Sequence, residues 1–161
     1  MERVFLGLGS NLGDRLENLE KAAKRIGVRC GQIVKKSSIY ETDPVDFLDQ
    51  PAFFNQVLEI QTDLSPTDLM SECLATEREL GRIRDVPKGP RIIDIDILIY
   101  DQRQIEITEP VPVIVPHPRM HLRRFVLEPL AEIAPDLVLS TGRTIANVLN
   151  DLTDSSRVTK L

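Results

Sequence analysis

Two aspartates two residues apart, Asp94 and Asp96, have the clearest chemical potential in this sequence. They lie in the isoleucine-rich segment GPRIIDIDILIY, residues 89–100, which is typical of a β-strand. Side chains alternate along a strand, so both carboxylates face the same side, roughly 6–7 Å apart. Carboxylates are costly to bury unless they are paired or bind a metal, and Mg²⁺ prefers such oxygen ligands. The pair predicts a Mg²⁺ site, although two aspartates so spaced are also common on solvent-exposed strands.

Basic residues surround the aspartate pair, although the chain as a whole has a net charge of -5. Between residues 78 and 91, five basic residues outnumber two acidic ones: Arg78, Arg82, Arg84, Lys88 and Arg91 against Glu79 and Asp85. A second basic group follows at His117, Arg119, His121, Arg123 and Arg124. Arginine matches the geometry of phosphate oxygens, and Mg²⁺ held by carboxylates bridges them. Together these residues predict a polyphosphate ligand bound with Mg²⁺.

The sequence lacks the common motifs that bind nucleotides through the backbone. It has no P-loop motif, and GLGSNLG at residues 7–13 lacks the glycine spacing of a dinucleotide site. We interpret that segment as a tight turn from a strand into a helix. An ATP site in this chain must therefore be built from side chains.

His117 and His121 are four residues apart, the spacing of a zinc-binding pair on a helix. However, Pro116 and Pro118 flank the first histidine and disfavour a helix there. We therefore expect His117 to donate a hydrogen bond to a phosphate.

The composition is that of a globular protein, and 161 residues predict one domain over residues 1–161. The acidic net charge argues against a nucleic-acid partner, and no apolar run is long enough to span a membrane. The N-terminus has no basic segment or cleavage site typical of a signal peptide. Cys30 and Cys73 form no motif, so we expect two buried thiols in a cytoplasmic protein.

Hydrophobic periodicity and turn residues predict the order strand, helix, strand, strand, helix, strand. The expected strands are residues 3–8, 33–42, 54–61 and 89–100. The first helix is expected to begin at a cap on Ser10 or Asn11 and to end at Gly27, and the second to run from Ser65 to Gly81. A helical turn near Met120 and short helices near residues 128–134 and 144–152 complete the prediction.

This order is the split βαβ plan of an α+β fold with a ferredoxin-like βαββαβ core. In that plan the antiparallel sheet carries both helices on one face and leaves the other face for an active site. Alternation places four isoleucines on the helix side: Ile93, Ile95, Ile97 and Ile99. Ile92, Asp94, Asp96 and Leu98 then share the opposite face. We expect no second hydrophobic core.

Six segments in a fixed order carry a resemblance to a known family: GLGSNLGDR (7–15), SSIYETDP (37–44), QPAFFNQV (50–57), ELGRIR (79–84), GPRIIDIDIL (89–98) and VPHPRMHLRRFVLEPLAEIAP (115–135). With them, the chain resembles hydroxymethyl-dihydropterin pyrophosphokinase of folate biosynthesis. The last two segments together are the most specific. The resemblance implies a monofunctional enzyme that transfers diphosphate from ATP to the hydroxymethyl group of 6-hydroxymethyl-7,8-dihydropterin and releases AMP.

The resemblance also implies roles for individual residues. The catalytic residues would be Arg82, Arg91, Asp94 and Asp96, with two Mg²⁺ ions on Asp94 and Asp96. ATP would contact Arg82, Arg84, Arg91, Ile97, Ile114, His117 and Arg123. The pterin would bind to Thr42, Pro44, Val45, Phe53, Asn55 and Phe125, with its ring between the two phenylalanines and its edge bonded to Asn55. We expect a monomer or weak dimer whose partners are these two substrates.

Two positions depart from the family pattern. Some members carry an aromatic residue just before the Gly-Pro-Arg sequence, where this chain has Val86-Pro87-Lys88, and some carry a tyrosine at Pro118. Two alternative functions also remain open at this point. A ferredoxin-like binding or regulatory module would not respond to ATP with Mg²⁺ in a thermal shift assay. Another Mg²⁺-dependent nucleotidyltransferase would release pyrophosphate where the pyrophosphokinase releases AMP.

Overall fold

The computed structural model describes residues 1–44, 49–82 and 90–161. Eight strands, four α-helices and one 3-10 turn follow one another in these ranges: β1 (Glu2–Ser10), α1 (Arg15–Arg29), β2 (Gln32–Lys36), β3 (Tyr40–Thr42), β4 (Phe53–Thr62), α2 (Pro66–Glu79), β5 (Asp94–Tyr100), β6 (Ile105–Ile107), β7 (Val113–Val115), the 3-10 turn (Met120–Leu122), α3 (Arg124–Ile133), α4 (Ile145–Asn150) and β8 (Val158–Lys160).

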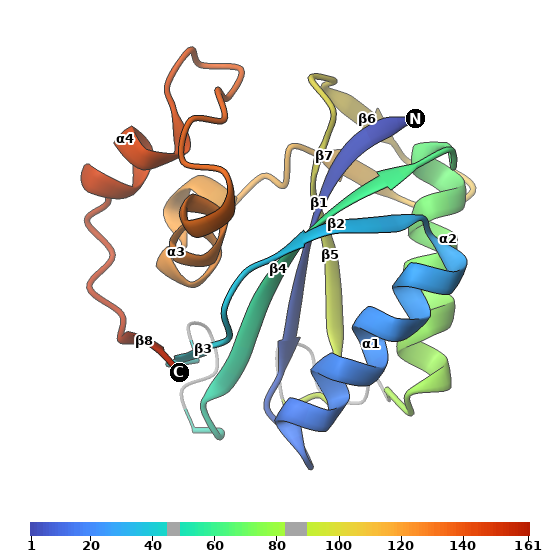
Figure 1. Ribbon diagram of the computed structural model, residues 1–161, viewed down its shortest axis with the longest axis horizontal. Helices are drawn as coiled ribbons and strands as arrows, with labels where there is room; N and C mark the ends of the chain where they lie inside the picture. The colour runs from blue at the N-terminus through green and yellow to red at the C-terminus, as the bar shows by residue number, and fades with distance from the viewer. Residues whose placement is uncertain (45–48, 83–89) are drawn as a thin grey trace.

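The main sheet is antiparallel and has the strand order β5-β1-β4-β3-β8, with β2 also paired to β4. β1 therefore lies between the last strand of the core and β4, as the split βαβ plan requires. α1 and α2 pack side by side against one face of this sheet (Figure 1). The predicted α+β, ferredoxin-like arrangement is confirmed.

The helix α2 begins where the sequence predicts. The Ser65 side chain accepts a hydrogen bond from the Asp68 amide, and Pro66 occupies the first helical position. α1 differs from the prediction at both ends, because Asp14 is its cap and the helix continues past Gly27 to Arg29. A glycine within a helix weakens it but does not end it unless the backbone turns there.

The sheet face opposite α1 and α2 is not wholly free, which corrects one expectation. α3 and α4 cover part of it, as Figure 1 shows on the far side of the sheet from α1. Contrary to the expectation of no second core, a second buried cluster forms there from Phe5, Val57, Leu98, Ile99, Met120, Val126, Leu127, Leu130, Ala134 and Ile145. The apolar spacing on α3 predicts a buried face, but not which side of the sheet it covers. The part of this face that α3 leaves uncovered is available for a site.

A β-bulge in β5 changes the predicted alternation. Leu6 pairs with Ile97 and Phe5 pairs with Ile99, so Leu98 has no partner of its own in β1. Before the bulge, Ile97 packs toward the helices as predicted. After it, Ile99 faces the second cluster instead, so the prediction for Ile99 was wrong. The carbonyl of Leu98 accepts a 2.8 Å bond from the amide of His117 and so fixes the segment that follows β7.

Two further details complete the fold. The predicted strand 33–42 is divided into β2 and β3, and the strand β8 was not predicted. Cys30 and Cys73 are both buried and free, as expected. Within the described ranges, the helices are too short or too polar to cross a membrane.

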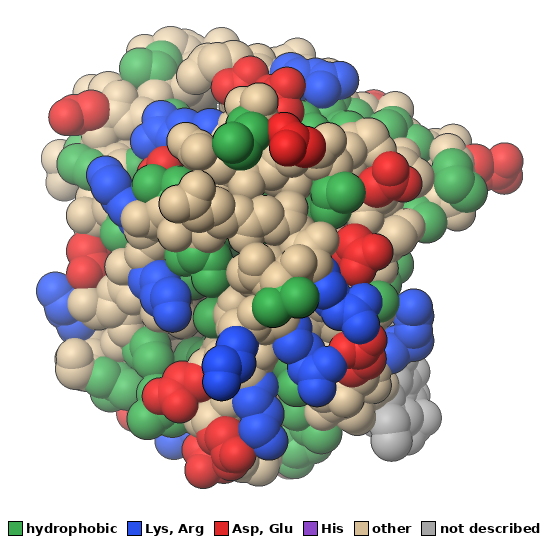
Figure 2. Space-filling view, turned by 45° about the vertical axis from the view of Figure 1, so that its right-hand side comes forward, with side chains coloured by type: hydrophobic (Ala, Val, Ile, Leu, Met, Phe, Trp, Pro, Cys, Tyr) green, Lys and Arg blue, Asp and Glu red, His purple; other side chains and the backbone are tan. Residues whose placement is uncertain are grey.

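The outer surface of α1 and α2 is strongly charged. Figure 2 shows lysine and arginine side chains there, interspersed with acidic ones. Arg25 and Arg29 of α1 both pair with Glu79 of α2, and Arg29 also reaches Glu72. These pairs join the two helices on the side away from the sheet.

Candidate active site

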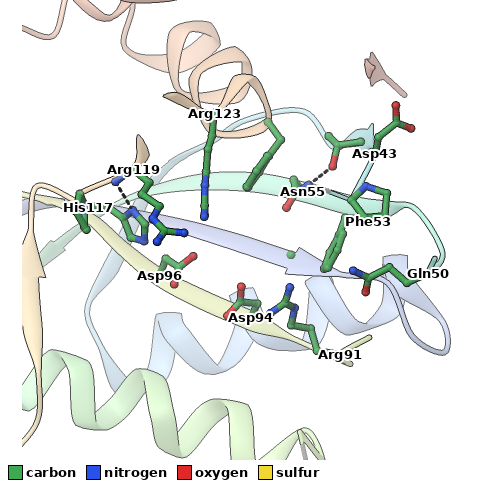
Figure 3. Close-up of a pocket in the computed structure, with 15 residues that line it drawn as sticks. Asp43, Gln50, Phe53, Asn55, Arg91, Asp94, Asp96, His117, Arg119 and Arg123 are labelled. Atoms are coloured by element: carbon green, nitrogen blue, oxygen red, sulfur yellow. Dashed lines mark hydrogen bonds between the residues drawn. The ribbon is translucent and has the colours of Figure 1, made fainter. Parts of the chain in front are cut away.

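A cavity of about 360 Å³ opens on the sheet face opposite α1 and α2 (Figure 3). Its lining comes from the ends of β1, β3, β4 and β5 and from the segment that leads into α3: Gly9, Thr42, Asp43, Pro44, Gln50, Phe53, Asn55, Arg91, Asp94, Asp96, His117, Pro118, Arg119, Arg123 and Phe125. Acidic and basic side chains meet in it with two aromatic rings.

Asp94 and Asp96 both project from β5 into the cavity, as the alternation of the strand predicts (Figure 3). Burial, together with the negative charges of Asp94 and Glu77, raises the pKa of Asp96 to about 7. The positive charges of Arg123 and Arg82 oppose this shift. The protein thus holds two carboxylates close together where a cation would relieve their repulsion.

Arg82 lies behind Asp94 and does not line the cavity. Its Nη1 donates to the carboxylates of Asp94 and Glu77, both at 2.8 Å, and the side chain is largely buried. Glu77 also accepts a 2.8 Å bond from the amide of Ile95. In this form Arg82 therefore orients one cavity carboxylate and ties β5 to the end of α2.

Arg91 has an unused hydrogen-bond donor beside the carboxylates. Its Nε is buried and has no hydrogen-bond partner within the described parts of the chain. Its guanidinium lies 5.0 Å from the centre of the Phe53 ring. A buried donor without a partner costs free energy, so this arginine is prepared to bind an anionic oxygen.

Asn11 connects two segments that border the cavity, one at Arg91 and one at residues 50–51. Its side chain is buried and accepts a 2.8 Å bond from the amide of Arg91. The same carboxamide donates to the Gln50 side chain at 2.8 Å and to the Pro51 carbonyl at 3.0 Å. We expected Ser10 or Asn11 to cap the first helix; Asp14 is the cap, and Asn11 fixes two site-forming segments instead.

His117 is held as a neutral hydrogen-bond donor. Its Nδ1 accepts a bond from the amide of Arg119 at 3.2 Å, which leaves the proton on Nε2. Burial and the nearby positive charge of Arg123 lower the pKa of His117 below its usual value, although Asp94 opposes this. Arg123 extends from the start of α3 toward the sheet (Figure 3).

The other end of the cavity is less charged. Asn55 is buried on β4 and donates through Nδ2 to the Thr42 hydroxyl. Its Oδ1 lies over Gly9. A Cβ on Gly9 would lie 2.7 Å from that Oδ1 and 3.5 Å from the Phe53 ring. Glycine is therefore required at position 9 for Asn55 and Phe53 to lie over β1. Phe125, on the first turn of α3, completes this end.

Comparison with known proteins identifies the family. Residues 5–135 match the family described as 7,8-dihydro-6-hydroxymethylpterin-pyrophosphokinase (HPPK). The chain belongs to this family. It is therefore a pyrophosphokinase of folate biosynthesis, which transfers a pyrophosphoryl group from ATP to hydroxymethyl-dihydropterin. This confirms the expected function and decides against both alternatives.

Curated relatives match most of the chain. The 2-amino-4-hydroxy-6-hydroxymethyldihydropteridine pyrophosphokinase of Methylorubrum extorquens is 42% identical over 156 residues, which is 96% of each protein. The enzyme of the same name from Bacillus subtilis is 48% identical over 131 residues, 81% of this chain and 77% of its own. The folic acid synthesis protein fol1 of Pneumocystis carinii is 42% identical over 95% of this chain, but the match spans only 20% of that longer protein.

Solved structures agree on the HPPK fold. A crystal structure of HPPK-DHPS in complex with substrates superposes on 92% of this chain with a TM-score of 0.75 and 16% identity. Plasmodium falciparum HPPK-DHPS superposes with a TM-score of 0.72 and 17% identity. In both cases the match covers 43% of the longer chain.

The cavity gathers most of the residues that the HPPK resemblance implies. It contains Thr42, Pro44, Phe53, Asn55, Arg91, Asp94, Asp96, His117, Arg123 and Phe125. Ile97 is 2% exposed and packs its side chain toward the helices, and Ile114 is 49% exposed on β7. Neither lines the cavity, so their contact with adenine stays a prediction. Val45 and Arg84 lie outside the described residues, as does the departure at residues 86–88.

Five lining residues were not among the predicted site residues: Gly9, Asp43, Gln50, Pro118 and Arg119. Each belongs to a segment that the sequence singled out. Arg119 lies in the second basic group, and Asp43 and Gln50 belong to the family-like segments 37–44 and 50–57. What the sequence could not show is which of these side chains turn inward.

The donors in the cavity fit Mg²⁺ better than zinc. Among residues 1–44, 49–82 and 90–161, no group of three or more His, Cys, Asp or Glu side chains could hold a metal ion. Two carboxylates, however, are what Mg²⁺ commonly takes from a protein when substrate phosphates and water complete its shell. Burial and the negative charges of Asp94 and Glu77 raise the pKa of Asp96, and such an ion would favour its charged form.

Proposed function

We propose that the diphosphate transfer takes place in this cavity, with the ATP phosphates at the charged end and the pterin at the Asn55 end. The observation that supports it most is the position of Asp94 and Asp96, which lie between His117 and Arg119 on one side and Arg91 and Phe53 on the other side of one cavity. Both substrates can then reach the same pair of carboxylates.

Asp94 and Asp96 would hold two Mg²⁺ ions. Bound there, the ions would supply charge neutralisation for the triphosphate and polarise the oxygens of an in-line displacement. The bond from Arg82 fixes the Asp94 carboxylate before any ligand arrives. Arg82 therefore acts mainly through Asp94 and Glu77, and its predicted direct contact with phosphate stays a prediction.

Arg91, His117 and Arg123 would bind the phosphate oxygens. Arg91 offers its unpartnered Nε, and His117 offers the proton on Nε2. Because the pKa of His117 is lowered, it donates as a neutral group, while the arginines carry the charge. Hydrogen bonds with a charged partner are about twice as strong as neutral ones.

The pterin would bind between Phe53 and Phe125, with its edge on Asn55. The carboxamide of Asn55 offers an acceptor and a donor in fixed directions, because Thr42 holds it. Thr42, Pro44 and Gly9 line the same end. The Arg91 guanidinium, 5.0 Å from the centre of the Phe53 ring, would support the ring on which the pterin stacks.

In the reaction, the hydroxymethyl oxygen of the pterin forms a bond to the β-phosphorus of ATP. The bond from that phosphorus to the α,β-bridging oxygen breaks, AMP leaves with that oxygen, and the hydroxyl proton is released to solvent. Phosphoryl transfer requires little covalent chemistry from the protein, so alignment and charge stabilisation account for most of the rate. Arg91, whose backbone Asn11 holds, and Arg123, at the start of α3, would provide that alignment.

Release of AMP with the purified chain tests the residue roles. Asp96→Asn should reduce AMP release from ATP and hydroxymethyl-dihydropterin by about a hundredfold or more, the scale of a lost charge-stabilising group. Asp136→Asn is a matched control, because Asp136 is exposed and lies outside the cavity. Equal activity of both variants at saturating Mg²⁺ would remove Asp96 from the site.

We also propose that the chain acts in the cytoplasm as a monomer or weak dimer. Sedimentation at micromolar concentration would test the state of assembly.

A further inference from the structure

The C-terminal segment returns to the cavity from outside the region that matches the family. The match ends at residue 135, and β8 begins at Val158. β8 adds an edge strand beside β3, with Thr42 opposite Val158 and Tyr40 opposite Lys160 (Figure 1). Thr42 is the residue that holds the Asn55 carboxamide. The last residues of the chain therefore support the strand that borders the pterin end.

Arg157 holds the cavity residue Asp43 from several directions. Its amide donates to Asp43 Oδ2 at 3.2 Å, and its Nε donates to Oδ1 at 3.1 Å. Its carbonyl accepts a bond from the Asp43 amide at 3.2 Å. Its Nη1 donates to Glu41 at 3.2 Å. Backbone and side chain of Asp43 are thus both fixed by one residue.

Asp154 holds the start of α3 in the same way. Its Oδ2 accepts a bond from the amide of Arg124 at 3.1 Å, and its carbonyl accepts one from Arg124 Nε at 3.0 Å. The Ser156 amide and hydroxyl donate to its Oδ1, which keeps the carboxylate in place. Arg124 lies between Arg123 and Phe125, and both of these line the cavity.

We propose that residues 154–157 form a strap that fixes the start of α3 relative to the end of β3 and so sets the width of the pterin end of the cavity. Asp154 and Arg157 are then positioning residues for the reaction. They act through Arg124 and Asp43, respectively. This inference depends on the proposed location of the pterin between Phe125 and the Asn55 region.

A purely stabilising role would have a different signature. The side chains of Arg157 and Asp43 are 49% and 45% exposed, and exposed ion pairs contribute little to stability. A displacement of about 1 Å in a binding site, by contrast, can reduce its efficiency strongly. Loss of the strap should therefore change pterin use far more than it changes folding.

The test compares Arg157→Ala and Asp154→Ala with wild type by steady-state kinetics, varying each substrate in turn. We expect the KM for hydroxymethyl-dihydropterin to rise about threefold to tenfold, with kcat and the KM for ATP within about twofold. Arg157→Lys keeps the charge but loses the forked geometry, so its KM for the pterin should lie between those of wild type and Arg157→Ala. Arg143→Ala is the matched control, because it breaks an exposed ion pair with Asp151 outside the cavity.

Each outcome decides the question. The proposal would be overturned if the strap variants raise the KM for both substrates equally or for neither. It would also be overturned if Arg143→Ala raises the KM for the pterin as much as they do. If Arg157→Ala strongly lowers the unfolding temperature, the kinetics of Asp154→Ala decide, because that variant removes the attachment to Arg124 instead. A KM for pterin that rises only in variants with a lowered unfolding temperature would count against the proposal. If Asn55→Ala leaves pterin KM unchanged, the location of the pterin fails. If Asn55→Ala raises it but the strap variants do not, only the strap fails.

Discussion

Asn11 and Arg91 bind each other through reciprocal hydrogen bonds. The Asn11 amide donates to the Arg91 carbonyl at 3.1 Å, and the Arg91 amide donates to Asn11 Oδ1 at 2.8 Å. The same Asn11 side chain also reaches Gln50 and Pro51. One buried residue just after β1 thus connects the segment that carries Arg91, the proposed phosphate ligand, with a segment at the proposed pterin end.

Asn11→Ala should therefore impair the use of both substrates. It leaves the Arg91 amide and the Pro51 carbonyl without their partner, at about 1–3 kcal/mol of stability. Denaturant unfolding and kcat/KM for each substrate measure the two effects. Asn147→Ala removes an exposed amide from α4 and serves as the control. An effect on one substrate only would show that Asn11 does not couple the two segments.

Asp96→Asn should separate stability from activity. Burial and the charges of Asp94 and Glu77 raise the pKa of Asp96, so the ionised carboxylate is unfavourable in the metal-free folded protein. Replacing it with a neutral amide should therefore raise the unfolding temperature in the presence of a chelator while activity is lost. An inactive variant that is also less stable would indicate a structural role.

Signals confined to a few neighbouring residues predicted the fold well. Ser65-Pro66 starts α2 because the cap and the first helical turn depend on adjacent residues. Asp94 and Asp96 face one cavity because the period of a strand is two. The bulge at Leu98 depends on pairing with β1, a contact between distant parts of the chain, so the reversal of Ile99 was not predictable.

The rest of the site depends on tertiary contacts in the same way. The resemblance implies that Arg82 contacts phosphate, but in the structure its guanidinium donates to Glu77 of α2 and to Asp94 of β5. Asn11 has the residue type of a helix cap, and only the approach of residues 50–51 gives it another role. Three residues of β8 are too few for a pattern, so their pairing with β3 could not be predicted.

Gly9→Ala should damage the pterin end specifically. The added Cβ would lie 2.7 Å from Asn55 Oδ1, so the carboxamide must move. Such overpacking costs about 1–3 kcal/mol, and we expect the KM for pterin to rise more than that for ATP. Gly27→Ala, on α1, is the control, because the added Cβ would only touch Ile33 of β2 at 3.7 Å. Unchanged pterin kinetics in Gly9→Ala would argue against Asn55 as a ligand.

Asn55→Ala should weaken pterin binding far more than ATP binding. Truncation removes the amide that Thr42 orients and leaves polar groups of a bound ligand without partners, at about 1–3 kcal/mol. Calorimetry with each ligand alone measures both affinities. Gln61→Ala removes an exposed amide from the other end of β4 and should change neither. A larger loss for ATP would mean that the two binding regions are reversed.

Glu132 attaches α3 to the sheet in a pH-dependent way. It accepts bonds from the Ser38 amide at 2.9 Å, the Ser38 hydroxyl at 2.7 Å and the Tyr40 hydroxyl at 2.8 Å, and it pairs with Lys160. Burial alone would raise the pKa of Glu132, but these hydrogen bonds and the charge of Lys160 hold it below its usual value. The carboxylate on α3 thus joins β3 and β8.

Because its pKa is lowered on folding, Glu132 stabilises the protein above the pKa of the unfolded chain, roughly 4.3. This contribution is lost as the pH falls through the still lower pKa of the folded state. Glu132→Gln should therefore be less stable than wild type by about 1 kcal/mol at pH 7, since the site is partly exposed. The difference should shrink below about pH 4, where wild type also loses the charge. Denaturant unfolding at both pH values measures it, with the exposed Glu106→Gln as control. A difference that stays constant across this range would show that the shape of Glu132, and not its charge, holds α3 to the sheet.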